Sequence, residues 1–305
     1  MKKFLICSPG YNPNNGGVIA LHKLCHLINL TGSEAYIHPF ENNFEFNKFN
    51  YHKILFKFLK DQIRSCYKPY KLNPSFNTPL LKDIGLLKNI NEWTIIYPEI
   101  TFGNPLNAKN VVRWLLHNPG FHTGKIYYHP NEIYFKFNSA ITDFNFPGSS
   151  TSVNELKVIH YPTEHYNQND SNQNRSGTAY CLRKGSNKKI IHNLNDSILI
   201  DGMSHKSVAE IFKQVKTFIS YDPYTAYSIF AILCGCQSVV IPDDGVNEEQ
   251  WYPNPTDRYG IAYGFEKIAA AQKTKHLVHE HIIKEQEKSY DNVKKFIVEC
   301  YSFFK

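Results

Sequence analysis

Several residues between positions 221 and 228 have side chains suited to binding an anion. Asp222 can cap the start of a helix, Pro223 suits the first turn, and Thr225 and Ser228 place hydroxyl groups close behind. A helix N-terminus offers free N–H groups and a partial positive charge to a negatively charged ligand. The spacing therefore predicts a phosphate-binding corner with Asp222 as the helix cap.

Three further side chains are candidates for proton transfer. Glu99 follows the apolar run WTIIYP, His117 follows VVRWLL, and Asp143 follows a third apolar run. Carboxylates and imidazoles are common general acids and bases, and polar side chains at the carboxyl ends of parallel strands project toward bound ligands. A hydrogen-bonded structural role at a strand end is the alternative for each of them.

The elements around the predicted phosphate corner form a strand, helix, strand unit. An apolar, β-branched strand at 217–219 precedes the corner, and an apolar helix-length segment runs from Tyr224 to the turn Cys234-Gly235-Cys236. A second strand follows at 238–241. Both strands lack polar alternation, which is typical of central strands in a parallel sheet.

The N-terminal region has the same pattern. A buried strand is predicted at 2–7, an amphipathic helix at 18–30 and a second strand at 33–38. The loop before the helix ends in Gly16 and Gly17, where missing side chains would let a ligand approach the backbone. A glycine-rich turn without a ligand is the alternative.

The stretch SYDPYTAYSIFAILCGCQSVVIP, residues 220–242, resembles the central element of the C-terminal domain in GT-B glycosyltransferases. Retaining GT-B families mark this element with one Glu in the loop and a second Glu on the helix. Here the loop reads YDPY and Phe230 takes the position of the second Glu. The departure favours an inverting reaction over the retaining one.

The resemblance implies an α/β fold with two Rossmann-like domains that face each other across a cleft. We expect an N-terminal acceptor domain at 1–165, which contains an insertion near 41–90, and a donor domain at 166–280. A C-terminal helix at 281–305 would cross back to the first domain. The low-hydrophobicity run HYNQNDSNQNRSGT marks the expected boundary.

The resemblance also implies which residues bind the donor. Arg183 and Lys184, after a predicted strand at 179–182, match the basic position that meets the diphosphate, and the turn at 201–204 would hold the nucleotide base. The full predicted donor-binding set is Gly16, Gly17, Arg183, Lys184, Gly202, Met203, Tyr221, Asp222, Tyr224, Thr225 and Ser228. In an inverting enzyme the base would be Glu99, His117 or Asp143.

Composition limits the class of protein. The 305 residues contain an odd number of cysteines, seven, without C-x-x-C spacing, which indicates buried thiols in a reducing cytosol and no zinc site or disulfide framework. The short apolar run at the N-terminus predicts a strand, not a signal peptide, and no run is long enough to span a membrane. We therefore expect a cytoplasmic protein, and the GT-B resemblance implies that it needs no metal or other cofactor.

The charged and aromatic residues indicate which macromolecular partners the protein could contact. The net charge is +7, but no nucleic-acid motif appears, so a nucleic-acid partner is not expected. Segment 41–90 interleaves aromatic residues with lysines that include Lys53, Lys57 and Lys60. Such a segment suits peripheral contact with an anionic membrane at the inner face, although an ordinary helix with a solvated lysine face fits as well.

The expected activity is transfer of a sugar from a nucleotide-sugar to a glycan, a glycolipid or a surface polysaccharide. The alternative is a two-domain Rossmann-like protein that binds a sugar nucleotide, or an epimerase-like enzyme, without transfer. A nucleic-acid binder is a third class, and it would bind DNA or RNA with a steep dependence on salt.

Overall fold

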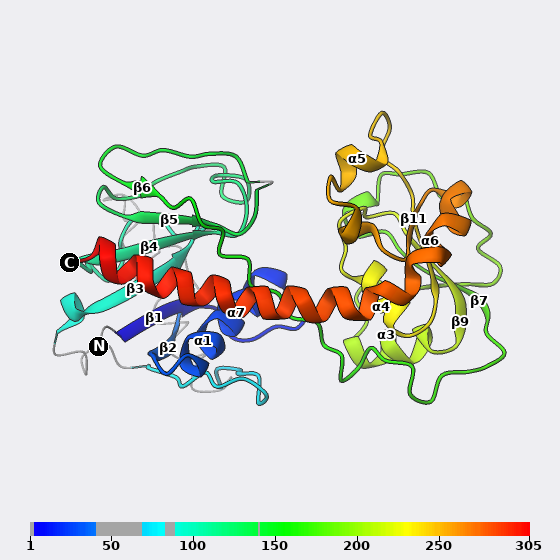
Figure 1. Cartoon of the computed structure of the whole chain (residues 1–305), viewed down its shortest axis with the longest axis horizontal. Coiled ribbons are helices and arrows are strands. Elements are labelled where there is room, and N and C mark those ends of the chain that lie inside the picture. The colour runs from blue at the N-terminus through cyan, green and yellow to red at the C-terminus, as the bar shows by residue number, and fades with distance from the viewer. Residues whose placement is uncertain (1–2, 41–68, 83–88, 140) are drawn as a thin grey trace, which may run out of the picture. The chain divides into compact units, whose positions relative to one another are not determined.

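The computed structural model describes residues 3–40, 69–82, 89–139 and 141–305 (Figure 1). Most of the predicted insertion near 41–90, with Lys53, Lys57 and Lys60, lies outside these residues. The chain divides into two units, one formed by Met1–His160 with Gln286–Lys305 and the other by Tyr161–Glu285.

The first unit is built on a parallel sheet with the strand order β2-β1-β3-β4-β5-β6. Its strands are β1 (Lys3–Ser8), β2 (Glu34–Pro39), β3 (Trp93–Pro98), β4 (Asn110–Leu115), β5 (Ile133–Lys136) and β6 (Ser150–Thr151). The strands predicted at 2–7 and 33–38 are confirmed, and the apolar runs WTIIYP and VVRWLL form β3 and most of β4. They form because long apolar runs can be buried on both faces of such a sheet.

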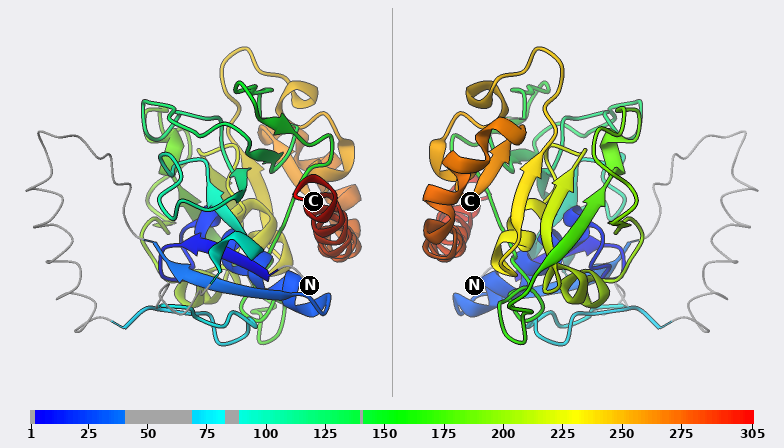
Figure 2. Two further views of the ribbon diagram at one scale, coloured as in Figure 1. Left: turned by 90° about the vertical axis from the view of Figure 1, so that its left-hand side faces the viewer. Right: turned by 90° about the vertical axis from the view of Figure 1, so that its right-hand side faces the viewer.

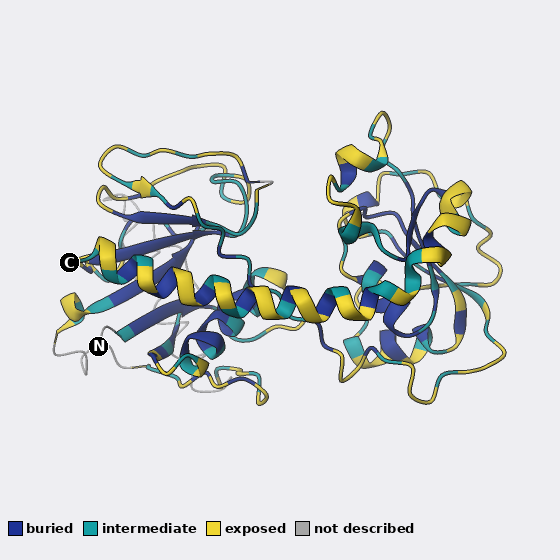
Figure 3. Cartoon of the chain, in the orientation of Figure 1, coloured by how far each residue is buried: buried dark blue, intermediate teal, exposed yellow. Residues whose placement is uncertain are grey.

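Both faces of this sheet are covered, as the dark-blue strands in Figure 3 show. Along β1, Phe4 and Ile6 pack into one core cluster while Leu5 and Cys7 pack into another, since successive side chains point to opposite faces. Helix α1 (Gly16–Leu30), capped by Asn15, packs on β1 and β2.

The long C-terminal helix α7 (Val278–Phe303) also packs on the first unit. Its residues Val293, Phe296, Ile297 and Cys300 are buried in the same cluster as Phe4. The expected return of the C-terminal helix to the first domain is therefore confirmed. No helix in the described part of the chain is long and apolar enough to cross a bilayer.

The second unit has its own parallel sheet, with the order β11-β10-β9-β7-β8. Its green to yellow strands run side by side in the right-hand view of Figure 2. The strands are β7 (Ser176–Cys181), β8 (Ser197–Leu199), β9 (Val215–Ser220), β10 (Gln237–Val240) and β11 (Ile261–Tyr263). The expected α/β class, with two parallel sheets, is confirmed.

Short helices lie between these strands, namely α3 (His205–Phe212), α4 (Tyr227–Leu233) and α5 (Glu248–Trp251), and α6 (Ile268–Thr274) follows β11. Single 3-10 turns occur at Arg183–Gly185, Pro255–Arg258, Phe265–Lys267 and Lys275–Leu277 in this unit, and at Ile90–Glu92 in the first unit. Ser204 caps α3, because its hydroxyl accepts the N–H of Ser207 in the first turn of the helix.

Candidate functional site

Each sheet has one topological switch point, where later strands are added on the opposite side of the first strand of that sheet. In the first sheet this place is between β1 and β3, and in the second it is between β7 and β9. Open parallel sheets bind ligands outside the carboxyl ends of the strands at such a point. The residues that follow these strands are therefore the candidates for chemistry.

Arg183 lies at the switch point of the second sheet. Its Nε lies 3.9 Å from the Asp222 carboxylate at the end of β9, and its guanidinium lies 5.2 Å from the centre of the Tyr227 ring. The side chain stays 40% exposed. An ion pair at 3.9 Å is loose, so the guanidinium retains N–H groups that can bind an anionic ligand. Lys184, the next residue in the chain, is exposed.

The turn that carries Arg183 is fixed by its backbone. Arg183 has a φ of +43°, and the N–H groups of Leu182 and Arg183 both donate to the Asp201 carboxylate, at 3.1 and 2.9 Å. A side chain at Gly185 would place its Cβ 1.9 Å from the carbonyl oxygen of Tyr221. Glycine is required here because the ends of β7 and β9 approach each other so closely.

The predicted helix start at Asp222 is wrong. Helix α4 begins at Tyr227, its N-cap is Ala226, and no side chain caps it. The Asp222 carboxylate instead accepts the N–H of Tyr224 at 3.1 Å. The hydroxyl of Ser220 donates to the Asp222 carbonyl, and the indole of Trp251 donates to the Pro223 carbonyl. These bonds keep the backbone at Asp222 and Pro223 out of the helix.

The two hydroxyls predicted near the helix start have different surroundings. Thr225 accepts the N–H of Tyr227 at 3.4 Å. Ser228 is buried at 2% exposure, and its hydroxyl has no hydrogen-bond partner among the described residues. Burial without a partner is costly, so Ser228 Oγ is an unsatisfied polar group within α4.

The two tyrosines of the loop differ in burial. Tyr221 is fully buried, and its hydroxyl is bound by the Ile191 N–H and lies 2.8 Å from His192 Nδ1, so this side chain is committed to the core. Tyr224 is 56% exposed and meets Tyr252 edge-on at 5.8 Å. Of the pair, only Tyr224 presents its ring to solvent.

Gly202 and Met203 form the turn after β8. Gly202 has a φ of +79°, a conformation that favours glycine, and the Met203 N–H donates to the Ile200 carbonyl at 3.2 Å. Met203 lines a shallow groove with Ile198 of β8, Ser204 and residues of α3. Both residues lie one strand away from Arg183, and the Asp201 carboxylate connects the two turns.

In the first unit, Glu99 directly follows β3 and is buried at 7% exposure. Its Oε2 accepts the N–H of Leu116 at 3.1 Å. Burial raises the pKa of the Glu99 carboxyl to about 7, while hydrogen bonds from backbone N–H groups and the charge of Arg113 lower it. A carboxyl that titrates near neutral pH is suited to general-base catalysis.

His117 follows β4 and Asp143 follows β5, but both are less suited than Glu99 to the role of base. The His117 ring stacks on Phe121 at 4.0 Å, and its Nδ1 accepts the N–H of Asn118. Asp143 is 83% exposed and pairs with Lys136 at 2.6 Å. The described contacts therefore favour Glu99 as the base.

Gly16 and Gly17 open helix α1 at the same edge of the first sheet. Open space surrounds the Cβ position of Gly16, while the Cβ position of Gly17 lies 3.5 Å from Leu116. Leu116 also donates its N–H to Glu99 and directly precedes His117. The structure thus brings Gly17, Glu99 and His117 together. Both glycines belong to the first unit, whereas Arg183 and Asp222 belong to the second.

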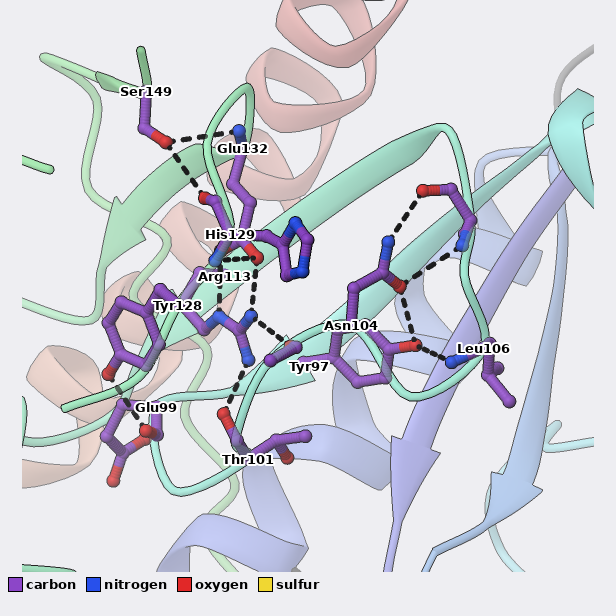
Figure 4. A network of polar contacts seen from close by, with 12 residues as sticks. Tyr97, Glu99, Thr101, Asn104, Leu106, Arg113, Tyr128, His129, Glu132 and Ser149 are labelled. Carbon is purple, nitrogen blue, oxygen red and sulfur yellow. Dashed lines mark hydrogen bonds and ion pairs between the residues drawn. The ribbon is translucent and has the colours of Figure 1, made fainter. Parts of the chain in front are cut away.

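The sequence reasoning missed Arg113 and Glu132. Arg113 is fully buried in β4, where it forms a two-pronged ion pair with Glu132 (Figure 4). The signal was a single arginine within the apolar run VVRWLL, since a charge in a buried strand requires a partner.

No family model matches the chain, and no curated protein matches it. Among solved structures, the chain is similar to MurG of Acinetobacter baumannii, at 10% identity over 98% of this chain and 100% of that chain, with a TM-score of 0.36. It is similar to TarM, at 10% identity over 100% and 99% of the two chains, with a TM-score of 0.42. A sucrose-phosphate synthase from Thermosynechococcus elongatus gives 10% identity over 97% and 94%, with a TM-score of 0.32.

Proposed function

We propose that this protein is a glycosyltransferase that moves a sugar from a nucleotide-sugar to a glycan or glycolipid acceptor. The observation that carries the proposal is the half-exposed Arg183 guanidinium at the switch point of a parallel sheet, with Lys184 beside it. Two cations at this place suit a diphosphate, which carries concentrated negative charge.

The chemistry assigns different roles to the two sheets. Arg183 and Lys184 stabilise the departing nucleoside diphosphate, and they supply the positive charge without a metal ion. The Glu99 carboxylate accepts the proton from the acceptor hydroxyl as that oxygen attacks the anomeric carbon. Attack opposite to the leaving group inverts the anomeric configuration.

The proposal of inversion rests on Phe230. This residue occupies the helix position where the retaining GT-B pattern has a Glu, and it is buried at 5% exposure with its ring stacked on Tyr166 at 4.4 Å. A hydrocarbon ring in a closed aromatic cluster offers no carboxylate to the donor sugar. An inverting reaction needs a base for the acceptor hydroxyl, and we assign that role to Glu99.

The function is tested in two steps. A thermal-shift screen of UDP-, GDP-, CMP- and dTDP-sugars identifies the donor, because a ligand that binds only the folded state raises the melting temperature. Mass-shift transfer from that donor to a panel of glycan and glycolipid acceptors then tests the reaction. Binding or nucleotide turnover without transfer would favour the epimerase-like or binding-protein alternative.

Arg183→Ala and Lys184→Ala are expected to weaken binding of the nucleotide-sugar. Each removes a charge-assisted contact worth about 1.5 to 3 kcal/mol, so the donor Kd should rise by about tenfold or more, with the melting temperature unchanged. Isothermal titration measures the Kd. The matched control is Lys189→Ala, an exposed lysine of the same loop that follows the turn. Equal Kd values for all variants would place the donor site elsewhere.

An acceptor contact is proposed at Phe121. This ring is 64% exposed while one of its faces stacks on His117, directly after β4. An aromatic face suits the apolar C–H face of a sugar ring. Phe121→Ala is expected to raise the acceptor KM by about fivefold at unchanged donor Kd, because stacking of this kind is worth about 1 kcal/mol. Phe121→Tyr should restore the KM, and Val153→Ala, another exposed apolar side chain, is the control.

The place of action is also proposed. Acceptors on glycolipids or surface polysaccharides would be reached at the cytoplasmic face of a membrane. Contact with anionic lipid through the lysines of segment 41–90 stays a prediction, since those residues lie outside the described part of the chain.

A further inference from the structure

Arg113 is a fully buried arginine whose hydrogen bonds converge on one loop of the first unit (Figure 4). Its Nη1 donates to the carbonyl of Thr101 and its Nη2 to the carbonyl of Gly103, both at 2.8 Å. These two carbonyls belong to the loop that leaves β3 immediately after Glu99. The guanidinium therefore fixes the backbone that follows Glu99 in the chain.

Tyr128 fixes the same loop from a second direction. Its hydroxyl donates to the carbonyl oxygen of Glu99 at 2.8 Å, and its ring lies 4.5 Å from the Arg113 guanidinium. The ring of Tyr97 lies on the guanidinium as well, at 5.2 Å. Together with the Leu116 N–H on Oε2, these bonds hold both the backbone and the carboxylate of Glu99.

Glu132 balances the charge of Arg113. Its two oxygens accept from Nε at 3.0 Å and from Nη2 at 2.6 Å, and Oε1 also accepts the N–H of His129. Ser149 binds the backbone N–H of Glu132. An unpaired charge in this place would be very costly, so the pair allows a cation to stand next to Glu99 without imposing its full field on that carboxyl.

We infer that Arg113, Glu132 and Tyr128 are positioning residues that hold Glu99 in place for proton abstraction. The inference rests on the proposed function, because Glu99 is the base only in that reaction. The charged and titratable groups around Glu99 include Arg113 on β4 and Tyr128 before β5, and Arg113 in turn faces Glu132 and Tyr97. The arrangement sets both the direction of the carboxylate and the pH at which it ionises.

The test uses a pair of single-atom deletions. Tyr128→Phe removes the hydroxyl that binds the Glu99 carbonyl, and Tyr134→Phe, a buried tyrosine 5.8 Å away that makes no contact with that carbonyl, is the matched control. Tyr128→Phe is expected to lower kcat by about tenfold at unchanged donor Kd, since small misplacements of a catalytic group are costly. The control should retain the wild-type kcat. Equal kcat values in the two variants would overturn the inference.

A second variant reads out the ionisation of Glu99 directly. Glu132→Gln keeps the shape of the side chain and leaves Arg113 without a counter-charge, so the pKa of the Glu99 carboxyl should fall. Carbon-13 NMR titration of the labelled carboxyl is expected to show a lower midpoint than in the wild type, and Tyr134→Phe should leave the midpoint unchanged. An unchanged midpoint in folded Glu132→Gln contradicts the inference.

These readouts separate two kinds of failure. If the wild-type protein transfers no sugar from any donor, the proposed function fails, yet the NMR titration still shows whether Arg113 and Glu132 control Glu99. If the wild-type protein transfers sugar while Tyr128→Phe matches Tyr134→Phe, the positioning role alone fails.

Discussion

Glu99→Gln is expected to lower kcat by about 10²- to 10⁴-fold while the donor Kd stays at the wild-type value. The amide keeps the size of the side chain but cannot accept the proton of the acceptor hydroxyl. Steady-state kinetics and titration calorimetry measure the two quantities. Glu34→Gln, on an exposed residue at the start of β2, is the control with the same chemical change.

The pH dependence provides a second test of Glu99. Burial raises the pKa of this carboxyl to about 7, so kcat should rise with pH and level off above about 7, once the carboxylate is ionised. Stability should change in the opposite direction. Between the ordinary pKa of 4.5 and about 7, the folded protein holds a proton that the unfolded chain has released, so raising the pH through this window destabilises the fold.

Two results would contradict the assignment of Glu99. Turnover of Glu99→Gln within a few-fold of the wild type would show that another group takes the proton. A product that retains the anomeric configuration of the donor would count against the assignment independently, since a retaining reaction in which the acceptor attacks from the face of the leaving group needs no such base.

The melting temperature of Glu99→Gln is expected to lose the pH dependence described above, because the variant has no carboxyl at this position.

Arg113→Met is expected to lower the free energy of unfolding by about 3 to 5 kcal/mol. The substitution leaves the Glu132 carboxylate buried without its partner and frees the carbonyls of Thr101 and Gly103 from their hydrogen bonds. Denaturant unfolding followed by circular dichroism measures the change.

The control is Arg183→Met, the same substitution on a guanidinium that is 40% exposed and only loosely paired. It should leave the free energy of unfolding near the wild-type value, because exposed ion pairs contribute little to stability, and should weaken donor binding instead. Similar unfolding free energies in the two variants would show that the Arg113 network does not stabilise the unit.

The sequence determined the elements of the fold. Strands such as β9 and β10 were evident because their apolar residues run without polar alternation between turn residues, and only a doubly covered parallel sheet buries such runs. The positions of Glu99 and Arg183 directly after strands were also evident, since strand ends can be read locally. The cap of α3 is also a local feature, because the Ser204 hydroxyl accepts the N–H of Ser207 only three residues later.

Local patterns could not determine the start of α4. Asp222 and Pro223 have the composition of a helix start, and the sequence alone favoured one there. The bonds that hold them in a turn come from Ser220 and from the distant Trp251. A contact between segments far apart in the chain overrode the local preference.

The tertiary structure alone decided which charges meet. Arg113 with Glu132, and Arg183 with Asp222, come from different strands or loops, and each pair forms because parallel pairing fixes which strand ends lie side by side. A sequence shows that a residue is charged and stands in or after a buried run. The partner depends on strand order and register, which long-range packing sets, and the pKa of Glu99 depends on the burial that this packing produces.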